Sequence, residues 1–274
     1  MATIIVYRSR SASYAANRVA KAAEPITAMQ EDAFERNVDE VLDVAVVRWD
    51  CHKDLGLPST CIDVNPHAAV VLARDKAASR RILAELSPPT WTSKADIQVP
   101  CVIRPRTHKA GKRFHVVRET SGILRAVKRC GPEWYASQLI DKAREFRVFV
   151  VQGRVAAVSE RFGASPTEIA WNIARGGRLI NVERTEWPIN VIRTALEAMR
   201  RLGLGFGAVD VCICTQGRAW VFEANTSPAL RNKYTIKKIA QSLAMAATPP
   251  KPVKEGAQKP RSYAHPATLP KRER

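Results

Sequence analysis

The chain alternates between short apolar runs, which predict strands, and segments with apolar residues three and four positions apart, which predict helices. The segment TIIVY and the run VLDVAVVR are the first two predicted strands. Two later runs that meet at Gln152-Gly153 predict a β-hairpin. The predicted strands cover residues 3–7, 41–48, 99–104, 114–118, 135–140, 144–152 and 154–161.

Helical spacing predicts helices between these strands. In the second helix, Asn65 suits the capping position and Pro66 the first helical position, and the Ser87-Pro88-Pro89 run ends it. The predicted helices cover residues 11–23, 66–86, 188–202 and 235–246. Because antiparallel hairpins are separated by helices without a regular βαβ series, the pattern indicates an α+β fold.

The most informative segment is GAVDVCICTQGRAWVFEANTSP, residues 207–228. Two apolar runs flank a Thr-Gln-Gly turn, which predicts a hairpin. Asp210 lies in its first strand, and Glu223 and Asn225, two apart in the second strand, share one face. Magnesium prefers such carboxylate and amide oxygens, so the hairpin predicts a Mg-nucleotide site. The alternative is that these acidic residues are edge residues or partners of arginine.

Composition bounds the class of protein. A chain of 274 residues with 46% hydrophobic residues can form one large or two small domains with a core. It contains no apolar run of about 18 residues, so we expect no membrane span. The apolar N-terminal segment precedes its basic residues, which is the wrong order for a secretory signal. We therefore expect a cytoplasmic protein.

The net charge of +18 favours anionic partners: nucleotides, acidic peptides or nucleic acid. Residues 248–274 are rich in proline and charge, and we expect them to form a disordered tail. The six cysteines include no C-x-x-C pair, so reduced thiols are expected in place of disulfides or a zinc site.

Several segments, in this order and spacing, resemble the ATP-grasp ligases, particularly the branch of the RimK-like glutamate ligases and glutathione synthetase. The chain is also similar to small ATP-grasp proteins of phage origin. The resemblance covers roughly residues 41–246 and rests on NPHAAVVLARDKAASRRIL, VPCVIRPRTHKAGK, SQLIDKAREFRVFVVQGRV, RFG, WNIARGG and GFGAVDVCI…VFEANTSP.

This resemblance implies the ATP-grasp fold, in which two α+β subdomains grip ATP after a short α/β N-terminal domain. We expect the N-terminal domain at residues 1–65 and the small subdomain at 66–134. The large subdomain, with the magnesium site, is expected at 135–247, followed by the tail at 248–274.

The resemblance also implies a reaction. ATP phosphorylates a carboxylate, and an amine attacks the acyl phosphate to give an amide, ADP and phosphate. This chemistry needs positioning and charge neutralisation more than a protein nucleophile. Asp210, Glu223 and Asn225 would hold one or two magnesium ions, with manganese as a possible substitute.

The resemblance places Lys76 and Arg104 near the α- and β-phosphates. It also places the loop at residues 107–112 where the family has a glycine-rich phosphate lid, although this loop has a single glycine. The loop residues that would contact phosphate in its place are His108, Lys109 and Lys112. The alternatives are a solvated helix face for Lys76 and a solvated basic loop.

The segment Gln138-Leu139-Ile140 matches the linker whose backbone meets adenine in the family. Glu145 is placed to bind the ribose hydroxyls, and alternation puts Arg147 on the same face. The alternative for this pair of positions is a cross-strand salt bridge.

The resemblance also implies catalytic residues. Arg161 corresponds to an arginine that meets the transferred phosphate or acyl phosphate. Asn172 and Arg175, in WNIARGG, resemble the N-x-x-x-G-G element of the glutamate-ligase branch. Asn172 would be a third-phosphate or metal-shell ligand, and the glycine pair would let backbone approach the substrate closely.

Three functions remain open at this point. The first is a carboxylate–amine ligase acting on an acidic small molecule, peptide or protein. The second is an ATP-grasp kinase that releases a phosphorylated product. The third is a basic nucleic-acid-associated or interaction protein that keeps the fold, although no RNA- or DNA-reading motif is present.

Overall fold

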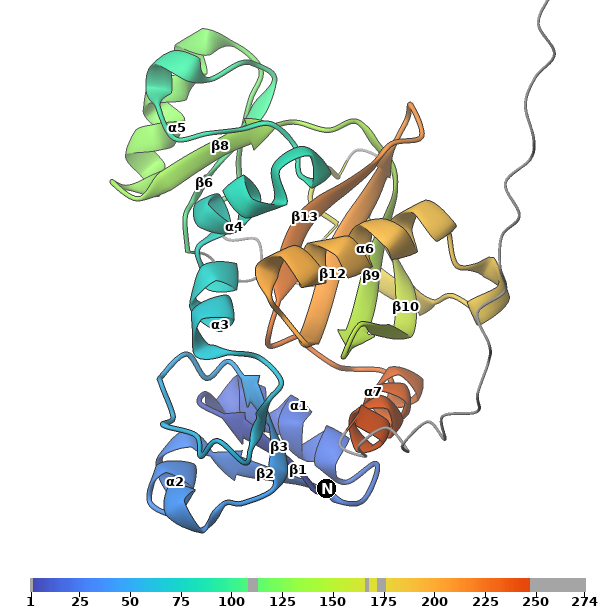
Figure 1. Ribbon diagram of the computed structural model, residues 1–274. Coiled ribbons are helices and arrows are strands. Elements are labelled where there is room, and N and C mark those ends of the chain that lie inside the picture. The colour runs from blue at the N-terminus through green and yellow to red at the C-terminus, as the bar shows by residue number, and fades with distance from the viewer. Residues whose placement is uncertain (1, 108–112, 166–167, 172–175, 247–274) are drawn as a thin grey trace, which may run out of the picture.

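The computed structural model describes residues 2–107, 113–165, 168–171 and 176–246. Its strands form three sheets, which lie one above another in Figure 1. The N-terminal sheet is at the bottom, the five-stranded sheet is in the middle, and a small four-stranded sheet is at the top. The α+β prediction is confirmed, and the predicted tail lies outside the described residues.

The N-terminal sheet is parallel and has the strand order β2-β1-β3-β4. The chain therefore leaves β1 toward one side of the sheet and returns to β3 on its other side. The strands are β1 (Ala2–Tyr7), β2 (Ile26–Gln30), β3 (Val44–Trp49) and β4 (Ile62–Asp63), and the helices are α1 (Arg10–Ala20) and α2 (Glu31–Glu35).

Two short helices then connect this sheet to the small sheet: α3 (His67–Arg74) and α4 (Lys76–Leu83). The small sheet is antiparallel with the order β5-β8-β6-β7, and α5 packs its buried face against it. Its elements are β5 (Thr90–Trp91), β6 (Cys101–Pro105), β7 (His115–Val117), α5 (Ile123–Cys130) and β8 (Trp134–Gln138).

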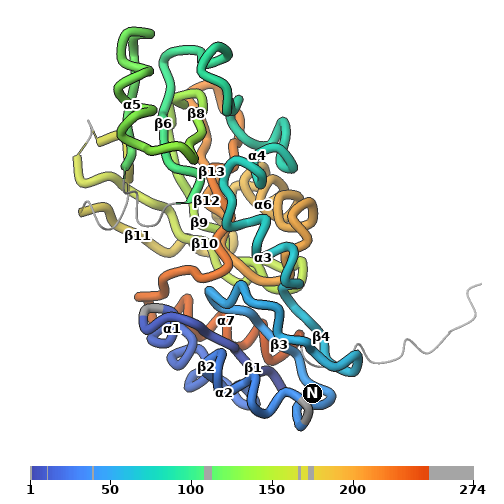
Figure 2. Tube along the Cα trace, turned by 90° about the vertical axis from the view of Figure 1, so that its left-hand side faces the viewer, coloured from blue at the N-terminus to red at the C-terminus, as the bar shows by residue number. Residues whose placement is uncertain are grey.

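The central sheet is antiparallel and has the order β11-β10-β9-β12-β13. Its strands are β9 (Lys142–Val151), β10 (Arg154–Phe162), β11 (Arg178–Asn181), β12 (Phe206–Cys214) and β13 (Ala219–Asn225). Helix α6 (Ile189–Leu202) covers one face, and α7 (Lys233–Ala246) lies against the other face and against α1. Figures 1 and 2 both show α7 between the central and N-terminal sheets.

Short 3-10 turns complete the described elements. They are Val38–Glu40, Ala84–Leu86, Lys94–Asp96, Thr120–Gly122 and Arg184–Glu186. Several elements lacked a clear sequence pattern and were not predicted: β2, α2, α5 and β11. None is longer than eight residues, so each carries too few turns or alternations to stand out.

The prediction of one helix over residues 66–86 is wrong, because the chain breaks at Asp75 into α3 and α4. The capping role predicted for Asn65 is also wrong. Pro66 occupies the cap of α3, and the fully buried Asn65 side chain binds Phe206 at the start of β12. Asn65 thus ties the connection after the N-terminal sheet to the central sheet.

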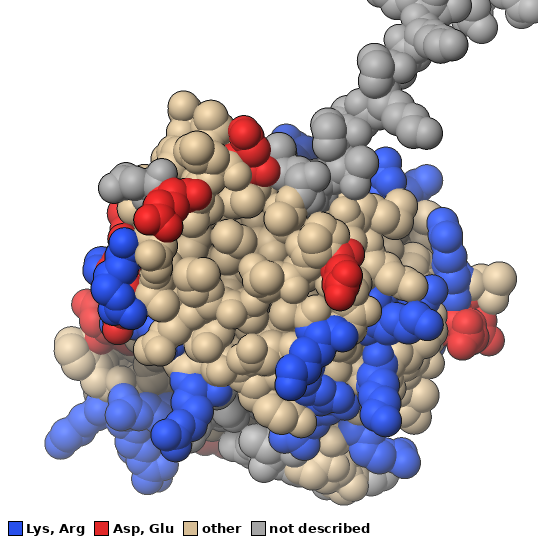
Figure 3. Space-filling model, turned by 90° about the horizontal axis from the view of Figure 1, so that it is seen from below, with Lys and Arg blue, Asp and Glu red and all other residues tan. Residues whose placement is uncertain are grey.

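None of the helices in the described part of the chain has the length and apolar character needed to cross a membrane. Figure 3 shows the molecule from below, where lysine and arginine side chains outnumber acidic ones and gather toward the lower part of the view. The positive net charge is therefore evident on this face of the folded protein.

Replacing Asn65 with alanine tests the tie to the central sheet. The Asn65 amide accepts from the Phe206 N–H at 2.8 Å and donates to the Phe206 carbonyl at 2.9 Å. Asn65→Ala leaves both buried backbone groups without this partner, so the free energy of unfolding should fall by about 2 to 4 kcal/mol. Urea denaturation measures the change. The control Asn37→Ala removes an exposed bond to Ala33 and should change it by less than about 0.5 kcal/mol; equal effects would contradict the prediction.

Candidate functional site

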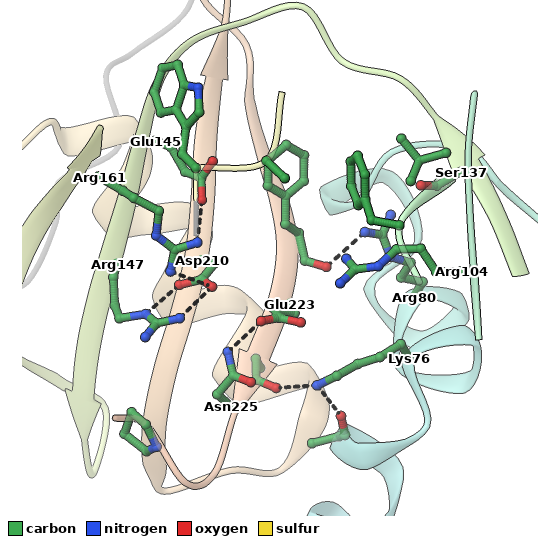
Figure 4. A pocket seen from close by; sticks show the side chains of 18 of the residues that line it. Lys76, Arg80, Arg104, Ser137, Glu145, Arg147, Arg161, Asp210, Glu223 and Asn225 are labelled. Carbon is green, nitrogen blue, oxygen red and sulfur yellow. Dashed lines mark hydrogen bonds and ion pairs between the residues drawn. The ribbon is translucent and has the colours of Figure 1, made fainter. Parts of the chain in front are cut away.

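One cavity of about 660 Å³ lies among α4, the small sheet, the central sheet and the loops that follow β3 and β13. Most of the site residues predicted from the sequence line it. Those in the described part of the chain are Lys76, Arg104, Gln138, Leu139, Ile140, Glu145, Arg147, Arg161, Asp210, Glu223 and Asn225. Figure 4 shows acidic side chains of the central sheet facing cations of α4 and β6 across it.

The register of the central sheet brings the charged positions together. Asp210 on β12 is paired with Arg147 on β9 and, on its other side, with Glu223 on β13. Glu145 on β9 is paired with Arg161 on β10. Because the sheet is antiparallel and side chains alternate, these residues from four strands share one face.

Asp210 is the centre of a buried ionic network. Arg147 donates two bonds to its carboxylate, Nε to Oδ1 at 2.7 Å and Nη2 to Oδ2 at 2.8 Å. Arg161 Nη2 donates to Oδ2 at 3.0 Å, and Arg161 Nη1 donates to Glu145 at 2.5 Å. Lys142 also pairs with Glu145. The salt-bridge alternative for Glu145 is therefore confirmed, and Asp210 is a partner of two arginines.

Burial alone would lower the pKa of the Arg161 guanidinium. The charges of Asp210 and Glu145 outweigh that effect and raise the pKa above its ordinary value. Arg161 therefore remains a cation inside the site, held by two carboxylates.

The predicted metal ligands lie side by side. Asn225 Nδ2 donates to Glu223 Oε1 at 3.0 Å, so the carboxylate and the amide face each other on β13 beside Asp210 (Figure 4). In the described part of the chain, no three His, Cys, Asp or Glu side chains converge as a metal cluster. A set of two carboxylates and an amide, all oxygen donors, nevertheless suits magnesium, which completes its shell with water and phosphate. These residues could therefore hold that ion.

The opposite wall of the cavity is cationic. Lys76 is almost fully buried, and its Nζ donates to the carbonyls of Ala73 at 2.9 Å and Ala224 at 3.0 Å. Burial lowers the pKa of the Lys76 ammonium below its ordinary value, against the charge of Glu223. The solvated-face alternative for Lys76 is therefore wrong. Arg104, on β6, reaches the same wall.

Arg80 is a site residue that the sequence analysis missed. It lies one helical turn after Lys76 and is 5% exposed. Its Nη2 donates to the Phe222 carbonyl at 2.9 Å, and its guanidinium lies 5.4 Å from the centre of the Tyr135 ring. Its Nε and Nη1 are buried and have no hydrogen-bond partner among the described residues. The four-residue spacing from Lys76 was the available signal.

Asp75 positions this cationic wall. Its side chain accepts from the N–H groups of Ala77 and Ala78 at 3.0 Å, which starts α4 one residue before Lys76. Its carboxylate also pairs with Arg106, just after β6. The break that the helix prediction missed is therefore what turns Lys76 and Arg80 toward the cavity.

The linker after β8 forms another edge of the cavity, close to Val102 and Phe222. Two of its amides already have backbone partners: Gln138 N donates to Pro89 at 2.9 Å, and Leu139 N donates to Pro100 at 3.0 Å. These bonds fix the linker in an extended form beside two apolar side chains. The combination makes a slot suited to a flat ring.

The remaining predicted site residues lie outside the described residues. They are His108, Lys109, Lys112, Asn172 and Arg175. Their predicted contacts with phosphate and substrate stay predictions.

Sheets of this topology, meeting at a cavity with acidic strands on one side and cations on the other, define a recognisable class. Residues 80–241 match a family model whose description is an ATP-grasp domain, the second family of its clade. The chain belongs to this ATP-grasp family, which confirms the fold expected from the sequence. A search of the curated proteins found no match.

Solved structures of ATP-grasp ligases share the fold at low sequence identity. A D-alanine–D-alanine ligase from Bacillus anthracis has a TM-score of 0.64 and 13% identity, over 90% of this chain and 98% of that one. The ATP-grasp ligase PsnB with its minimal precursor has a TM-score of 0.63 and 14% identity, over 90% and 100%. The macrocyclase MdnC from Microcystis aeruginosa MRC, bound to precursor peptide MdnA, has 0.59 and 16%, over 89% and 99%.

Removing the Asp75 side chain tests how α4 is held. Burial acts to raise the pKa of Asp75, but bonds from Arg106, Ala78 and Ala77 hold it below its ordinary value of 3.8. Asp75→Ala should lower the free energy of unfolding at pH 7 by about 1 to 2 kcal/mol through loss of the cap. A depressed carboxyl pKa stabilises the fold above the unfolded pKa, and this stability is lost as pH falls through the folded pKa.

The difference between wild type and Asp75→Ala should therefore shrink below about pH 4. Urea unfolding at a series of pH values measures it. Asp75→Asn, which can still cap the helix, should recover most of the loss at pH 7. A difference that stays constant with pH would contradict the role assigned to the charge.

Proposed function

We propose that this protein is an ATP-dependent carboxylate–amine ligase that forms an amide or peptide bond and releases ADP and phosphate. One observation carries the proposal: the cavity divides its charge. Lys76, Arg80 and Arg104 lie on one wall, while Glu223 and Asn225 lie on the other beside Asp210. A nucleoside triphosphate with magnesium needs cations for its phosphates and oxygen donors for its metal.

The nucleotide would bind with its base in the slot formed by Val102, Phe222 and the linker at Gln138–Ile140. Lys76, Arg80 and Arg104 would then face the phosphates. Glu145, at the start of β9, would accept from the ribose hydroxyls while keeping its bond to Arg161. In this arrangement the nucleotide lies between the small and central sheets, which correspond to the two subdomains that grip ATP in the ATP-grasp class.

Asp210, Glu223 and Asn225 would hold magnesium, with manganese as a substitute. The bound metal neutralises phosphate charge and helps align the groups that react. Arg147 and Arg161 fix the orientation of Asp210 by three hydrogen bonds, so this carboxylate is held ready before substrate binds.

In the proposed reaction, the carboxylate of one substrate takes the terminal phosphate of ATP, and the resulting acyl phosphate is attacked by an amine. Arg161 is a buried permanent cation beside Asp210 and would stabilise the charge that develops on the phosphate in transfer. The walls of the cavity would keep water from the acyl phosphate. His108, Lys109, Lys112, Asn172 and Arg175 complete the proposed contacts.

The positive net charge supports an acidic substrate: an amino acid, a peptide or a protein. Structural neighbours with printed substrates include a D-alanine–D-alanine ligase and enzymes bound to precursor peptides, which supports an amino-acid or peptide substrate. The RimK-like branch, the phage resemblance and the cytoplasmic location remain parts of this proposal.

Loss of Glu223 tests the ligase proposal. Glu223→Gln should lower magnesium-dependent ADP release roughly 100-fold or more, because a charged oxygen is lost where the transferred phosphate is neutralised. ADP release is measured with a panel of amino acids and acidic peptides, and mass spectrometry identifies the product. The control Glu119→Gln, at an exposed position in the small sheet region, should leave the rate unchanged.

Three outcomes of this experiment would contradict the proposal. Equal rates in both variants would remove the acidic strands from the mechanism. A phosphorylated product without an amide would indicate a kinase. Salt-sensitive binding to nucleic acid with no ATP turnover under any condition would indicate the non-catalytic alternative.

Arg80 and its neighbour Arg81 provide a matched pair for the nucleotide contact. Arg80 is buried in the cavity wall with two donors that lack a partner among the described residues, whereas Arg81 is exposed. Arg80→Met should weaken ATP binding about 10-fold to 100-fold, because a bond between a charged donor and phosphate contributes about 1.5 to 3 kcal/mol. Arg81→Met should bind ATP like wild type.

Isothermal titration with a non-hydrolysable ATP analogue measures both affinities. Unfolding of the nucleotide-free variants provides the control for folding. A loss of affinity that only follows a loss of stability, or equal affinities for the two variants, would overturn the role of Arg80.

A further inference from the structure

A second group of cations lies at the end of the cavity formed by the N-terminal sheet. The strand order β2-β1-β3-β4 places the topological switch point between β1 and β3, and crevices at the carboxyl ends of such strands are where α/β sheets bind ligands. Arg8 directly follows β1, and Asp50 and His52 follow β3. Asp50 and His52 line the same cavity as the metal-site residues.

Two arginines from different elements converge on His52. Arg74, the last residue of α3, approaches His52 with Nη1 at 2.6 Å from Nδ1 and 3.0 Å from Nε2. Arg8 approaches the same ring with Nη1 at 3.3 Å from Nδ1 and still closer to Nε2. A neutral imidazole has one acceptor nitrogen, so it cannot satisfy two guanidinium groups.

The surroundings keep His52 neutral. Burial, followed by the charge of Arg74, lowers the pKa of His52 below its ordinary value, and a backbone bond to Asp50 opposes this effect only in part. The positive charge of the group is therefore on the arginines, and the ring between them acts as an acceptor.

Neither Arg8 nor Arg74 forms an ion pair with an acidic side chain among the described residues, although most buried or clustered arginines of the central sheet do. The nearby carboxylate of Asp50 accepts from Ser9 Oγ at 2.9 Å. Arg231, from the loop after β13, lines the same end of the cavity and adds a third guanidinium. Like charges that converge in this way favour an anion between them.

The N-terminus of α1 adds to this potential. Ser9 caps the helix between Arg8 and the first turn, and an eleven-residue helix carries a partial positive charge at its start. A simpler explanation exists for Arg74 alone, because a cation in the last turn of α3 stabilises the end of that helix. That explanation does not account for Arg8, which reaches the same ring from β1.

We propose that Arg8, His52 and Arg74 bind a substrate carboxylate that is not joined in the reaction. This inference rests on the proposed ligase function and names its substrate class: an amino acid or acidic peptide with one carboxylate beyond the reacting group. The cavity runs from Asn225 past Thr226 and Ser227 to this cluster, so one substrate can reach both ends.

Matched substrates and variants test the proposal by turnover. ADP release is measured with L-glutamate and L-aspartate, each compared with its side-chain amide and its α-amide. Wild type should prefer one carboxylate over its matched amide by about 100-fold in kcat/KM, the effect of one charged hydrogen-bonded pair. In Arg74→Gln and Arg8→Gln this preference should fall below about 10-fold, with the loss in KM and kcat almost unchanged.

The control is Arg193→Gln, on the exposed face of α6, which should keep the wild-type preference. The member of each amide pair that loses activity identifies which substrate carboxylate binds the cluster. A variant that lowers kcat and leaves the preference intact, or a wild type that turns over acids and amides equally, would overturn the proposal.

A binding measurement separates this proposal from the ligase function. Nuclear magnetic resonance of the His52 ring is followed during titration with glutarate, with glutaramide as the neutral comparison. In wild type, glutarate should shift the His52 signals and glutaramide should not, even if no ADP is released. In Arg74→Gln and Arg8→Gln the glutarate affinity should fall about 10-fold or more.

If glutarate leaves the His52 signals of wild type unchanged, or shifts them equally in the variants, the carboxylate site is wrong whatever the turnover shows. If the shift is present and ADP release is absent, the site stands and the ligase proposal fails.

Discussion

The bonds between Asp210 and two arginines are the interaction on which the site depends. Three buried charges from β9, β10 and β12 satisfy one another there, and burial of any one alone would cost several kcal/mol. The network exists only when these strands keep their register. A slip of one residue would move Asp210 and Arg147 to opposite faces, so the register of the sheet and the geometry of the site are the same constraint.

The opposite wall depends on a smaller feature, the start of α4 at Asp75. Its carboxylate caps the helix and holds Arg106, which fixes α4 against the small sheet. Lys76 and Arg80 then point from α4 toward the acidic strands. The charges of the cavity are thereby separated: cations on one layer, carboxylates on another, and space between them for a ligand that carries both phosphate and metal. A second cationic group at the N-terminal sheet extends the same principle to the far end.

Much of the candidate site could be predicted, because its central residues lie in strong local patterns. The hairpin that carries Asp210, Glu223 and Asn225 has two long apolar strands and a clear turn, so both its form and its shared face follow from alternation. Elements with few residues, such as β2 and α5, were missed because short segments show little periodicity. The break at Asp75 was missed because helical spacing continues across it.

The sequence by itself determined the fold class, the acidic hairpin and the family, since these depend on local periodicity and on an ordered set of short segments. Only the tertiary structure decided which charges meet. The pairing of Arg161 with Asp210 spans 49 positions, and the convergence of Arg8 and Arg74 on His52 joins three separate elements. Such contacts are set by strand register and by the packing of helices on sheets, which no local pattern encodes.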